Sequence, residues 1–225
     1  PARITSIGAF AFADTIISSL TFEGSDLGGD VIIGRYAFYG CDDMGTLVFA
    51  ENSKVKQIGE SAFRECTSIE EVSFPAALEN LGDKAFYRDY DIEDSHWRDN
   101  LEVTFAQNGT QPLTIGNSVF YGLIIEELNL PANAVISGAF FDGLTVNSLT
   151  VAEGNQSIAS VNHISEGETV GTALYLKGAD GSNETLLLYI AANDSPSGLT
   201  FDFAGAEGVN TIAAAAFAAT STLST

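Results

Sequence analysis

Residues 58–75 read IGESAFRECTSIEEVSFP, and this stretch decides the fold because its pattern returns along the chain. Its first part places an aliphatic residue, a glycine, two variable residues, a small residue and a phenylalanine in sequence. Copies with this spacing begin at Ile7, Ile33, Ile58, Leu81, Ile115, Ile136 and Ile212. Successive starts are 26, 25, 23, 34, 21 and 76 residues apart. Four of these intervals fall in the range of roughly 20 to 29 residues that is typical of leucine-rich repeats.

The second part of each unit is also regular, and it predicts a strand. Its last three positions alternate between apolar and variable residues, which indicates a strand with one buried face. The copies are Ile17-x-x-Leu20-x-Phe22, Met44-x-x-Leu47-x-Phe49, Ile69-x-x-Val72-x-Phe74, Ile125-x-x-Leu128-x-Leu130 and Val146-x-x-Leu149-x-Val151. We expect each unit to supply one strand, a turn and a tighter segment. A single unit cannot bury its own apolar face, so neighbouring units must stack into a solenoid.

The pattern Ile-Gly-x-x-Ala-Phe-x-x-Cys-x-x-Ile-x-x-Val-x-Phe-Pro of residues 58–75 resembles the BspA-like, or Treponema-type, leucine-rich repeat. The resemblance extends over nearly the whole chain. It implies a β-rich α/β solenoid, a right-handed leucine-rich-repeat superhelix of about seven repeats with a β-hairpin insertion.

Two interruptions of the period define the expected domains. Residues 1–151 hold repeats 1–6, with an insertion loop at 87–100. Residues 152–198 are predicted to form a β-hairpin insertion, because two strand-like runs flank the turn-rich segment GADGSN at 178–183. Residues 199–225 then supply a final partial repeat of the same solenoid. The alternative is that the second interruption is a separate domain.

The repeat register predicts which side chains form the core. The phenylalanine five residues after each aliphatic start is expected in one buried ladder: Phe12, Phe38, Phe63, Phe86, Phe120 and Phe141. Cys41 and Cys66 each follow such a phenylalanine by three residues, so they occupy equivalent positions in adjacent coils. We expect buried neighbouring thiols, and a disulfide is the open alternative.

Composition and charge exclude several classes of protein. Hydrophobic residues make up 45% of the 225 residues, as in folded proteins. The formal charge of −21 repels phosphate backbones and anionic lipids, so we expect no nucleic acid partner. Apolar runs such as 185–192 are far shorter than the roughly 20 residues of a membrane helix. The chain begins with Pro1 and lacks a basic segment followed by an apolar one, so we expect any export signal or anchor to lie outside this sequence.

The sequence predicts no enzyme, metal or cofactor site. It contains no Gly-x-Ser-x-Gly, His-Glu-x-x-His or phosphate-loop motif, and His96 and His163 are far apart without a pairing pattern. The acidic run from Asp89 to Asp94 is the best metal candidate. It does not fit a calcium-binding EF-hand, because its sixth position is Asp94 rather than glycine and its twelfth is Asn100 rather than glutamate.

Two sets of surface residues are candidates for binding. The outward strand positions are small, polar and acidic, and the binding candidates among them are Glu71, Ser73, Glu102, Thr104, Glu127 and Asn129. A second set is aromatic: Tyr39, Tyr87 and Tyr121 each follow a repeat phenylalanine, and Trp97 lies in the insertion. Each set also has an explanation other than binding. The strand residues suit strand propensity and solubility, and partial burial beside the core would explain the aromatic residues.

Proteins with the repeat that this chain resembles are bacterial cell-surface or secreted proteins associated with adhesion. The resemblance therefore implies a non-catalytic extracellular interaction scaffold that binds a protein through its repeat surface. The negative charge favours a protein partner with a basic patch. The alternative function is a carbohydrate-binding module or a glycan-directed protein.

Overall fold

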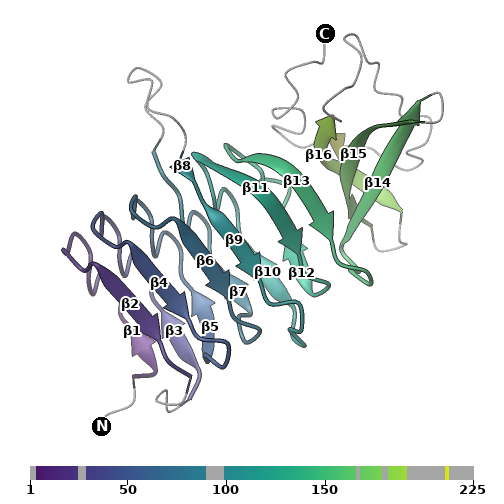
Figure 1. The fold of residues 1–225 in the computed structure, drawn as a ribbon. Coiled ribbons are helices and arrows are strands. Elements are labelled where there is room, and N and C mark those ends of the chain that lie inside the picture. Colours follow the sequence, from purple (N-terminus) through teal and green to yellow (C-terminus); the bar gives the residue numbers. More distant parts are fainter. Residues whose placement is uncertain are drawn as a thin grey trace.

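The computed structural model describes residues 4–24, 29–89, 99–165, 168–178, 182–191 and 211–212. Each of its six coils supplies one strand to each of two layers, and the fourth coil adds the short strand β8 (Asp99–Asn100). One strand of each coil joins a six-stranded parallel sheet in the order β1-β3-β5-β7-β10-β12 (Figure 1). Its members are β1 (Ser6–Ile7), β3 (Val31–Ile33), β5 (Val55–Ile58), β7 (Asn80–Leu81), β10 (Leu113–Ile115) and β12 (Ala134–Ile136).

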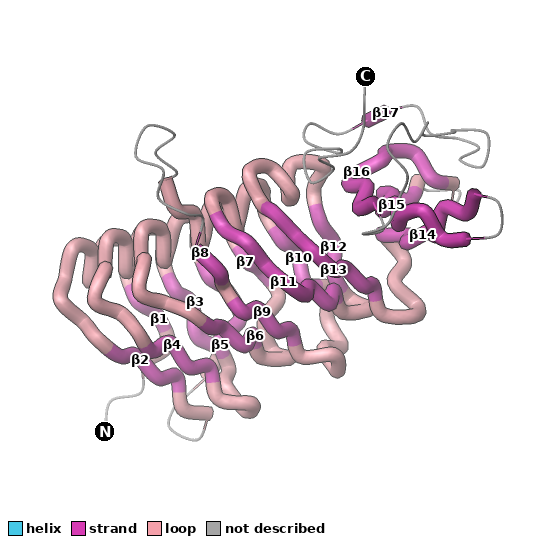
Figure 2. The backbone as a smooth tube through the Cα atoms, turned by 45° about the horizontal axis from the view of Figure 1, so that its top comes forward, coloured by secondary structure: helices cyan, strands magenta, loops and turns pink. Residues whose placement is uncertain are grey.

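The other strands of these coils form the opposite layer, and here the pairing is interrupted. The layer consists of the sheets β2-β4, β6-β9 and β13-β11-β8, all with parallel neighbours. Its strands are β2 (Ser19–Phe22), β4 (Thr46–Phe49), β6 (Glu71–Phe74), β8 (Asp99–Asn100), β9 (Glu102–Phe105), β11 (Leu123–Leu130) and β13 (Thr145–Val151). The loops that join the two layers lie in register from coil to coil (Figure 2).

Alternating side chains from both layers make one core. In β6, Val72 and Phe74 are buried while Glu71 and Ser73 are exposed. In β5, on the other side of the core, Val55 and Ile58 are buried. The expectation of one strand per unit was therefore wrong, since each coil has two. The additional strands are two to four residues long, which is too short for alternation to mark them in the sequence.

The described residues contain no helix, so the α/β part of the predicted fold class was wrong. The segment expected to be tighter is a turn in every coil. Its fourth residue has a φ between 49° and 57° at Phe10, Tyr36, Ser61, Lys84 and Ser118. A residue in this left-handed region cannot continue a right-handed helix, so the segment turns the chain from one layer to the other.

The repeat glycine is required by the close approach of adjacent coils. A Cβ atom added to Gly59 would lie 2.8 Å from the backbone nitrogen of Arg35, and one on Gly82 would lie 2.7 Å from that of Glu60. Backbone atoms cannot move aside as a flexible side chain does. Glycine at this position therefore lets successive coils stack through the six-stranded sheet.

The phenylalanine ladder is present, with two departures from the prediction. Ring centroids are 5.2 Å apart for Phe12–Phe38, 5.1 Å for Phe38–Phe63, 5.2 Å for Phe63–Phe86 and 6.0 Å for Phe86–Phe120. All the predicted members are buried except Phe12, which is 41% exposed because it lies in the first described coil. In the sixth coil it is Phe140, rather than the predicted Phe141, whose ring meets Phe120, at 6.2 Å. Phe141 is buried beside Phe140.

Cys41 and Cys66 are buried and are not joined by a disulfide. Each thiol donates a hydrogen bond to a carbonyl of the preceding coil, Cys41 to Phe12 and Cys66 to Phe38, both at 3.0 Å. Burial raises the pKa of the Cys66 thiol to about 12. The two cysteines therefore satisfy their polar atoms separately within the core.

After the sixth coil the chain forms a different, four-stranded sheet in the order β14-β15-β16-β17 (Figure 1). β14 (Ile158–Ser165), β15 (Glu168–Lys177) and β16 (Asn183–Ala191) are antiparallel neighbours, and β17 (Thr211–Ile212) pairs parallel with β16. The sequence indicated β15 and β16, and the structure adds β14 before them. How 152–198 and 199–225 divide into an insertion and a repeat stays a prediction.

The count of seven repeats was wrong. The seventh start, Ile212, pairs with Leu186 in the four-stranded sheet and does not extend the six-stranded one. Its phenylalanine, Phe217, lies outside the described residues. The solenoid described by the structure therefore makes about five turns, from β1 to β12.

Candidate functional site

The outward side chains of β2, β4, β6, β9, β11 and β13 make a surface that we call the strand face. Of the residues predicted to bind, Glu71, Ser73, Glu102, Thr104 and Glu127 are exposed on it, and Asn129 is half-buried. Each of these positions alternates with a buried apolar residue, so the repeat pattern itself sets their direction.

Two pairs of predicted residues are direct neighbours on β6 and β9. Glu71 lies opposite Glu102, and Ser73 lies opposite Thr104. The hydroxyl of Thr104 donates a hydrogen bond of 2.7 Å to the Ser73 hydroxyl. The strand face therefore carries a pair of adjacent carboxylates next to a pair of linked hydroxyls.

The remaining predicted strand residues are linked to one another on β11. The side-chain amide of Asn129 donates to Glu127 Oε1 at 3.0 Å, and Thr150 on β13 donates to Asn129 Oδ1. On the other side, Gln107 Nε2 donates to the backbone carbonyl of Asn129 at 3.4 Å. These contacts link Asn129 of β11 to β13 on one side and to Gln107, just after β9, on the other.

A groove runs along the strand face where β9 and β11 meet without forming a common ladder. It consists of two adjoining hollows of about 870 and 390 Å³ that share Val103, Thr104 and Asn129. The larger hollow also takes in Glu71, Glu102 and Glu127 from the predicted set, but Ser73 lines neither hollow. We call the two hollows together the strand-face groove. The structure thus brings five of the six predicted strand residues into one concave surface.

The larger hollow is acidic. Its lining includes the carboxylates of Glu70, Glu71, Glu102, Glu126 and Glu127. Among the residues that the structure describes, none of these five glutamates takes part in an ion pair. No ion pair among the described residues therefore neutralises these five carboxylates.

Arg88 is the basic residue in the lining of the groove, and it is engaged with the backbone. It is buried, and its guanidinium donates hydrogen bonds to the carbonyls of Ile69 at 2.5 Å and Cys66 at 3.3 Å. It fixes the start of the insertion to the preceding coil. These two hydrogen bonds tie its side chain to the backbone of the preceding coil.

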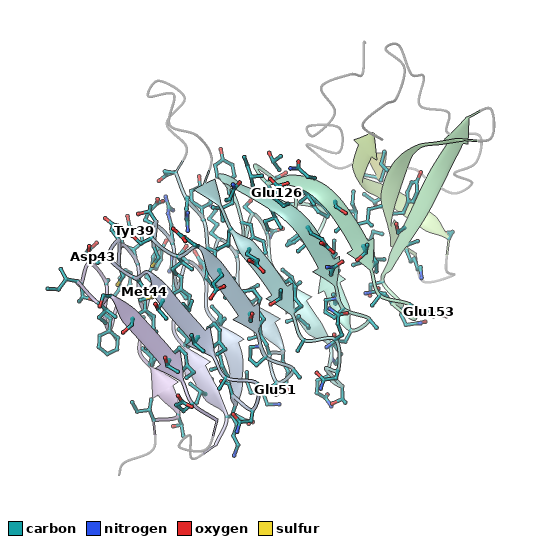
Figure 3. The ribbon with its side chains drawn as sticks, viewed as in Figure 1. Tyr39, Asp43, Met44, Glu51, Glu126 and Glu153 are labelled. Atoms are coloured by element: carbon teal, nitrogen blue, oxygen red, sulfur yellow. The ribbon has the colours of Figure 1, made fainter. Side chains whose placement is uncertain are left out.

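The predicted tyrosine row lies on the turns, away from the groove lining. The rings of Tyr87 and Tyr121 stack on each other at 4.4 Å, and the guanidinium of Arg64 lies 4.5 Å above the Tyr87 ring. Burial, and then the nearby carboxylate of Asp89, raises the pKa of Tyr87 to about 12. Tyr39 lies at the same edge of the molecule as Asp43 (Figure 3), and its ring meets Tyr36 edge-on at 5.7 Å. The ring faces of Tyr87 are therefore occupied by packing contacts, and the role of the row in binding stays a prediction.

The insertion is described only at its two ends. Trp97 and His96 lie outside the described residues, as does the acidic run after Asp89. Asp89 itself forms an ion pair of 2.7 Å with Arg64. His163 lies in β14. Within the described parts of the chain, no three His, Cys, Asp or Glu side chains gather as metal ligands, and no helix is long and apolar enough to cross a membrane.

Comparison with known proteins identifies the repeat. Residues 1–108 match the BspA type leucine-rich repeat region in six copies. This part of the chain is a BspA-type leucine-rich-repeat region. The family that the residues 58–75 resemble is thereby confirmed.

A solved structure shares the fold of the BspA-type solenoid. The crystal structure of the pneumococcal vaccine antigen PcpA superposes with a TM-score of 0.64 at 23% sequence identity. The match covers 98% of this chain and 55% of the PcpA chain, so our chain spans about half the length of that protein. No curated protein matches the sequence.

The BspA-type repeat did contain a signal for the acidic groove residues that sequence reasoning missed. Glu70 and Glu71 follow Ile69, and Glu126 and Glu127 follow Ile125, so the same Ile-Glu-Glu segment occurs at one repeat position in two coils. Only the second glutamate of each pair was expected to face outward. Because the larger hollow begins just before β6 and at the middle of β11, both members of each pair line it. Nothing in the repeat pattern indicated that the ladder is interrupted between β9 and β11.

Proposed function

We propose that this protein is a non-catalytic extracellular interaction scaffold, at the bacterial cell surface or secreted, that binds a protein partner through its strand face. The observation that carries this proposal is the acidic strand-face groove, whose glutamates have no ion-pair partner among the described residues. Open repeat surfaces of this kind serve as extended binding surfaces in other solenoids.

The two outer faces of the solenoid differ in charge, and this favours the strand face as the binding surface. The outward residues of the six-stranded sheet are mostly uncharged: Ser6, Ile32, Gln57, Asn80, Thr114 and Val135. Lys56 in β5 is half-buried, and its charge is paired with Glu79. The strand face carries glutamates on β6, β9 and β11. If the negative charge served only solubility, both faces would be expected to carry it.

The character of the groove favours a protein over a sugar or a nucleic acid. Sugar sites commonly use exposed aromatic platforms, and among the described residues the groove lining contains neither tyrosine nor tryptophan. The formal charge of −21 opposes nucleic acid. A partner with a basic patch would be attracted at long range and would lose little of its own solvation at the rim.

The location at the cell surface is supported by the family and by the fold. The solved relative is named a pneumococcal vaccine antigen, and we infer a comparable exposed location for this chain. Adhesion to another cell or to a matrix protein is the use that we propose for the exposed surface.

A binding screen tests this function. The purified chain is presented to an array of extracellular matrix proteins and to a glycan array, and each hit is measured at low and at high salt. We expect protein hits whose affinity falls as salt rises, because exposed charges are screened within about 10 Å at 0.1 M salt. Hits confined to glycans, or protein binding that does not respond to salt, would contradict the proposal.

Charge reversal locates the binding surface. Replacing Glu71, Glu102 and Glu127 with lysine should lower the affinity for a protein found in the screen by about tenfold or more, because the groove would then repel a basic patch. The control variant carries lysine at Asp89, Asp91 and Asp94, so it changes the net charge by the same amount but on the insertion. Loss of affinity from the second set alone would move the site from the strand face to the insertion.

A further inference from the structure

The interruption between β9 and β11 gives the strand-face groove a defined length and direction. A backbone hydrogen bond of 3.0 Å from Leu101 to Ile124 joins the chains at one end. Farther along, the Asn129 carbonyl accepts from the Gln107 side chain instead of from a neighbouring strand. The groove follows the four residues of β9, which at about 3.3 Å per residue corresponds to roughly 13 Å. An extended peptide of about four residues has this length.

The two ends of the groove have different chemistry. The end near Glu126 carries the five glutamates, and the smaller hollow at the other end is lined by neutral polar groups: Thr104, Gln107, Asn129 and Thr150. Glu126 and Glu153, which follows the last residue of the smaller hollow, lie toward opposite edges of the molecule in Figure 3. A ligand that fits therefore needs a cationic part at one end and hydrogen-bonding groups without charge along the rest.

The adjacent carboxylates of Glu71 and Glu102 carry a cost in the free protein. They are direct neighbours on β6 and β9, and adjacent strands lie about 4.8 Å apart, so the two negative charges repel each other. Glu79, which directly precedes β7 in the opposite layer, is instead paired with Lys56. A cation supplied by a partner would remove the repulsion between Glu71 and Glu102, and this is a reason for the pair to exist at a binding surface.

We propose that the strand-face groove binds an extended segment of a partner protein, with one arginine placed between Glu71 and Glu102 and uncharged residues lying along Thr104, Asn129 and Thr150. This inference rests on the proposed protein-binding function and specifies its site. Arginine fits because its planar guanidinium offers five donors in a fork that spans two carboxylates. The hydroxyl and amide groups of the neutral end are suited to the polar backbone of an extended chain. A metal ion fits less well, because no three ligands gather among the described residues.

The test uses the whole chain and a fluorescein-labelled synthetic peptide, Gly-Ser-Ser-Arg-Ser-Thr-Gly, measured by fluorescence anisotropy at low salt. Matched peptides carry Lys or Gln in place of Arg. We expect saturable binding of one Arg peptide per chain, weaker binding of the Lys peptide by about threefold or more, and no saturable binding of the Gln peptide.

Two double variants separate the groove from the overall charge. The double variant Glu71→Gln with Glu102→Gln should lower the affinity for the Arg peptide by about tenfold, which corresponds to about 1.4 kcal/mol of binding free energy. Glu51→Gln with Glu153→Gln removes the same charge from two exposed residues that lie outside the groove lining, and it should change affinity by less than about twofold. The first variant should also unfold at no lower temperature than the parent, because it removes a repulsion. This separates loss of binding from loss of folding.

Several results would overturn the proposal. Equal binding of the Arg and Gln peptides, or equal loss in both double variants, would mean that the groove does not select an arginine. Displacement of the peptide by micromolar CaCl₂ with one-to-one stoichiometry would identify the site as a cation site instead. A protein hit from the screen that is unaffected by Glu71→Gln with Glu102→Gln would leave the scaffold function standing and remove the groove as its site. Specific peptide binding without any protein hit would support the groove as an arginine-binding site and would contradict the scaffold function.

Discussion

The first and third coils contain the same repeat residues but use them in different surroundings. Phe12 is 41% exposed, whereas Phe63 is 1% exposed and stacks between two other rings. A Cβ atom on Gly8 would meet nothing within 4 Å, while one on Gly59 would meet backbone at 2.8 Å. The stability contributed by a repeat residue therefore depends on whether coils cover it on both sides, as expected when each repeat contacts only its neighbours.

The largest difference between the two coils should appear at the phenylalanines. Phe63→Ala is expected to lower the free energy of unfolding by about 3 to 5 kcal/mol, because it empties a closed space between Phe38 and Phe86. Phe12→Ala should cost about 1 to 2 kcal/mol, because its ring is already partly in water and packs on Phe38 alone among the ladder rings described. Urea unfolding of both variants measures the difference. Equal losses would show that the two coils are covered alike.

The repeat glycines should show the same contrast at a smaller scale. Gly59→Ala is expected to cost about 1 to 3 kcal/mol, since the new methyl group forces apart the backbones of two coils. Gly8→Ala adds the same methyl group where there is open space, and it should change stability by less than about 0.5 kcal/mol. Thermal unfolding of the pair provides the measurement. A large loss at Gly8 would mean that another coil or chain packs against that end in solution.

The two thiols test whether the first coil opens more readily than the inner ones. Cys41 bonds to Phe12 and lies beside Thr15 in the exposed first coil, while Cys66 bonds to Phe38 in the interior. Local opening of the end coil should expose Cys41 first. We expect iodoacetamide to modify Cys41 at least about tenfold faster than Cys66 in the native protein, as read by peptide mass spectrometry. In denaturant without reductant both thiols should react, and finding neither reactive would reveal a disulfide.

The buried Cys66 thiol should make the stability of the folded protein depend on pH. Its pKa in the folded protein is raised to about 12 by burial, above the ordinary value of 9.0. The folded state therefore holds this proton more tightly than the unfolded state. The resulting stability is present below about pH 9 and is lost as the pH rises from 9 toward 12. Cys66→Ala should reduce this alkaline loss in urea unfolding measured across that range.

The repeat pattern in the sequence was sufficient to predict the core but not the pairing of the strands. Phe63, Ile58 and Cys66 are buried where the repeat spacing places them, because a periodic apolar pattern reports directly on burial. The shift from Phe141 to Phe140 could not be predicted, since both residues are apolar and only packing against Phe120 selects one. The α/β part of the fold class was wrong at the segment expected to be tighter, because the positive φ of residues such as Ser61 has no signature in a non-glycine side chain.

The candidate site was predictable in its residues and not in its shape. Alternation along β6, β9 and β11 places Glu71, Glu102 and Glu127 outward, and this follows from the two-residue period of a strand. The groove arises because β9 joins β6 while β11 joins β8 and β13. β8 pairs with Leu123 and Ile124 at the start of β11, and the ladder does not continue from β8 into β9, which the repeat pattern does not encode.

The smallest expected effect concerns the strained turn residues. Ser118 has a φ of 49°, a conformation that costs a non-glycine residue about 1 to 2 kcal/mol. Glycine there removes this strain but increases the freedom of the unfolded chain, which offsets about 0.4 to 1 kcal/mol of the gain. We therefore expect Ser118→Gly to raise the free energy of unfolding by about 0.5 kcal/mol. The reciprocal change is Gly154→Ala, at a φ of 87° where an added Cβ would meet nothing within 4 Å, so conformation alone should lower stability by about 1 kcal/mol. Opposite signs in calorimetry of the two variants would confirm that strain rather than packing sets both effects, and a loss of stability in Ser118→Gly would show that its side chain contributes more than its backbone costs.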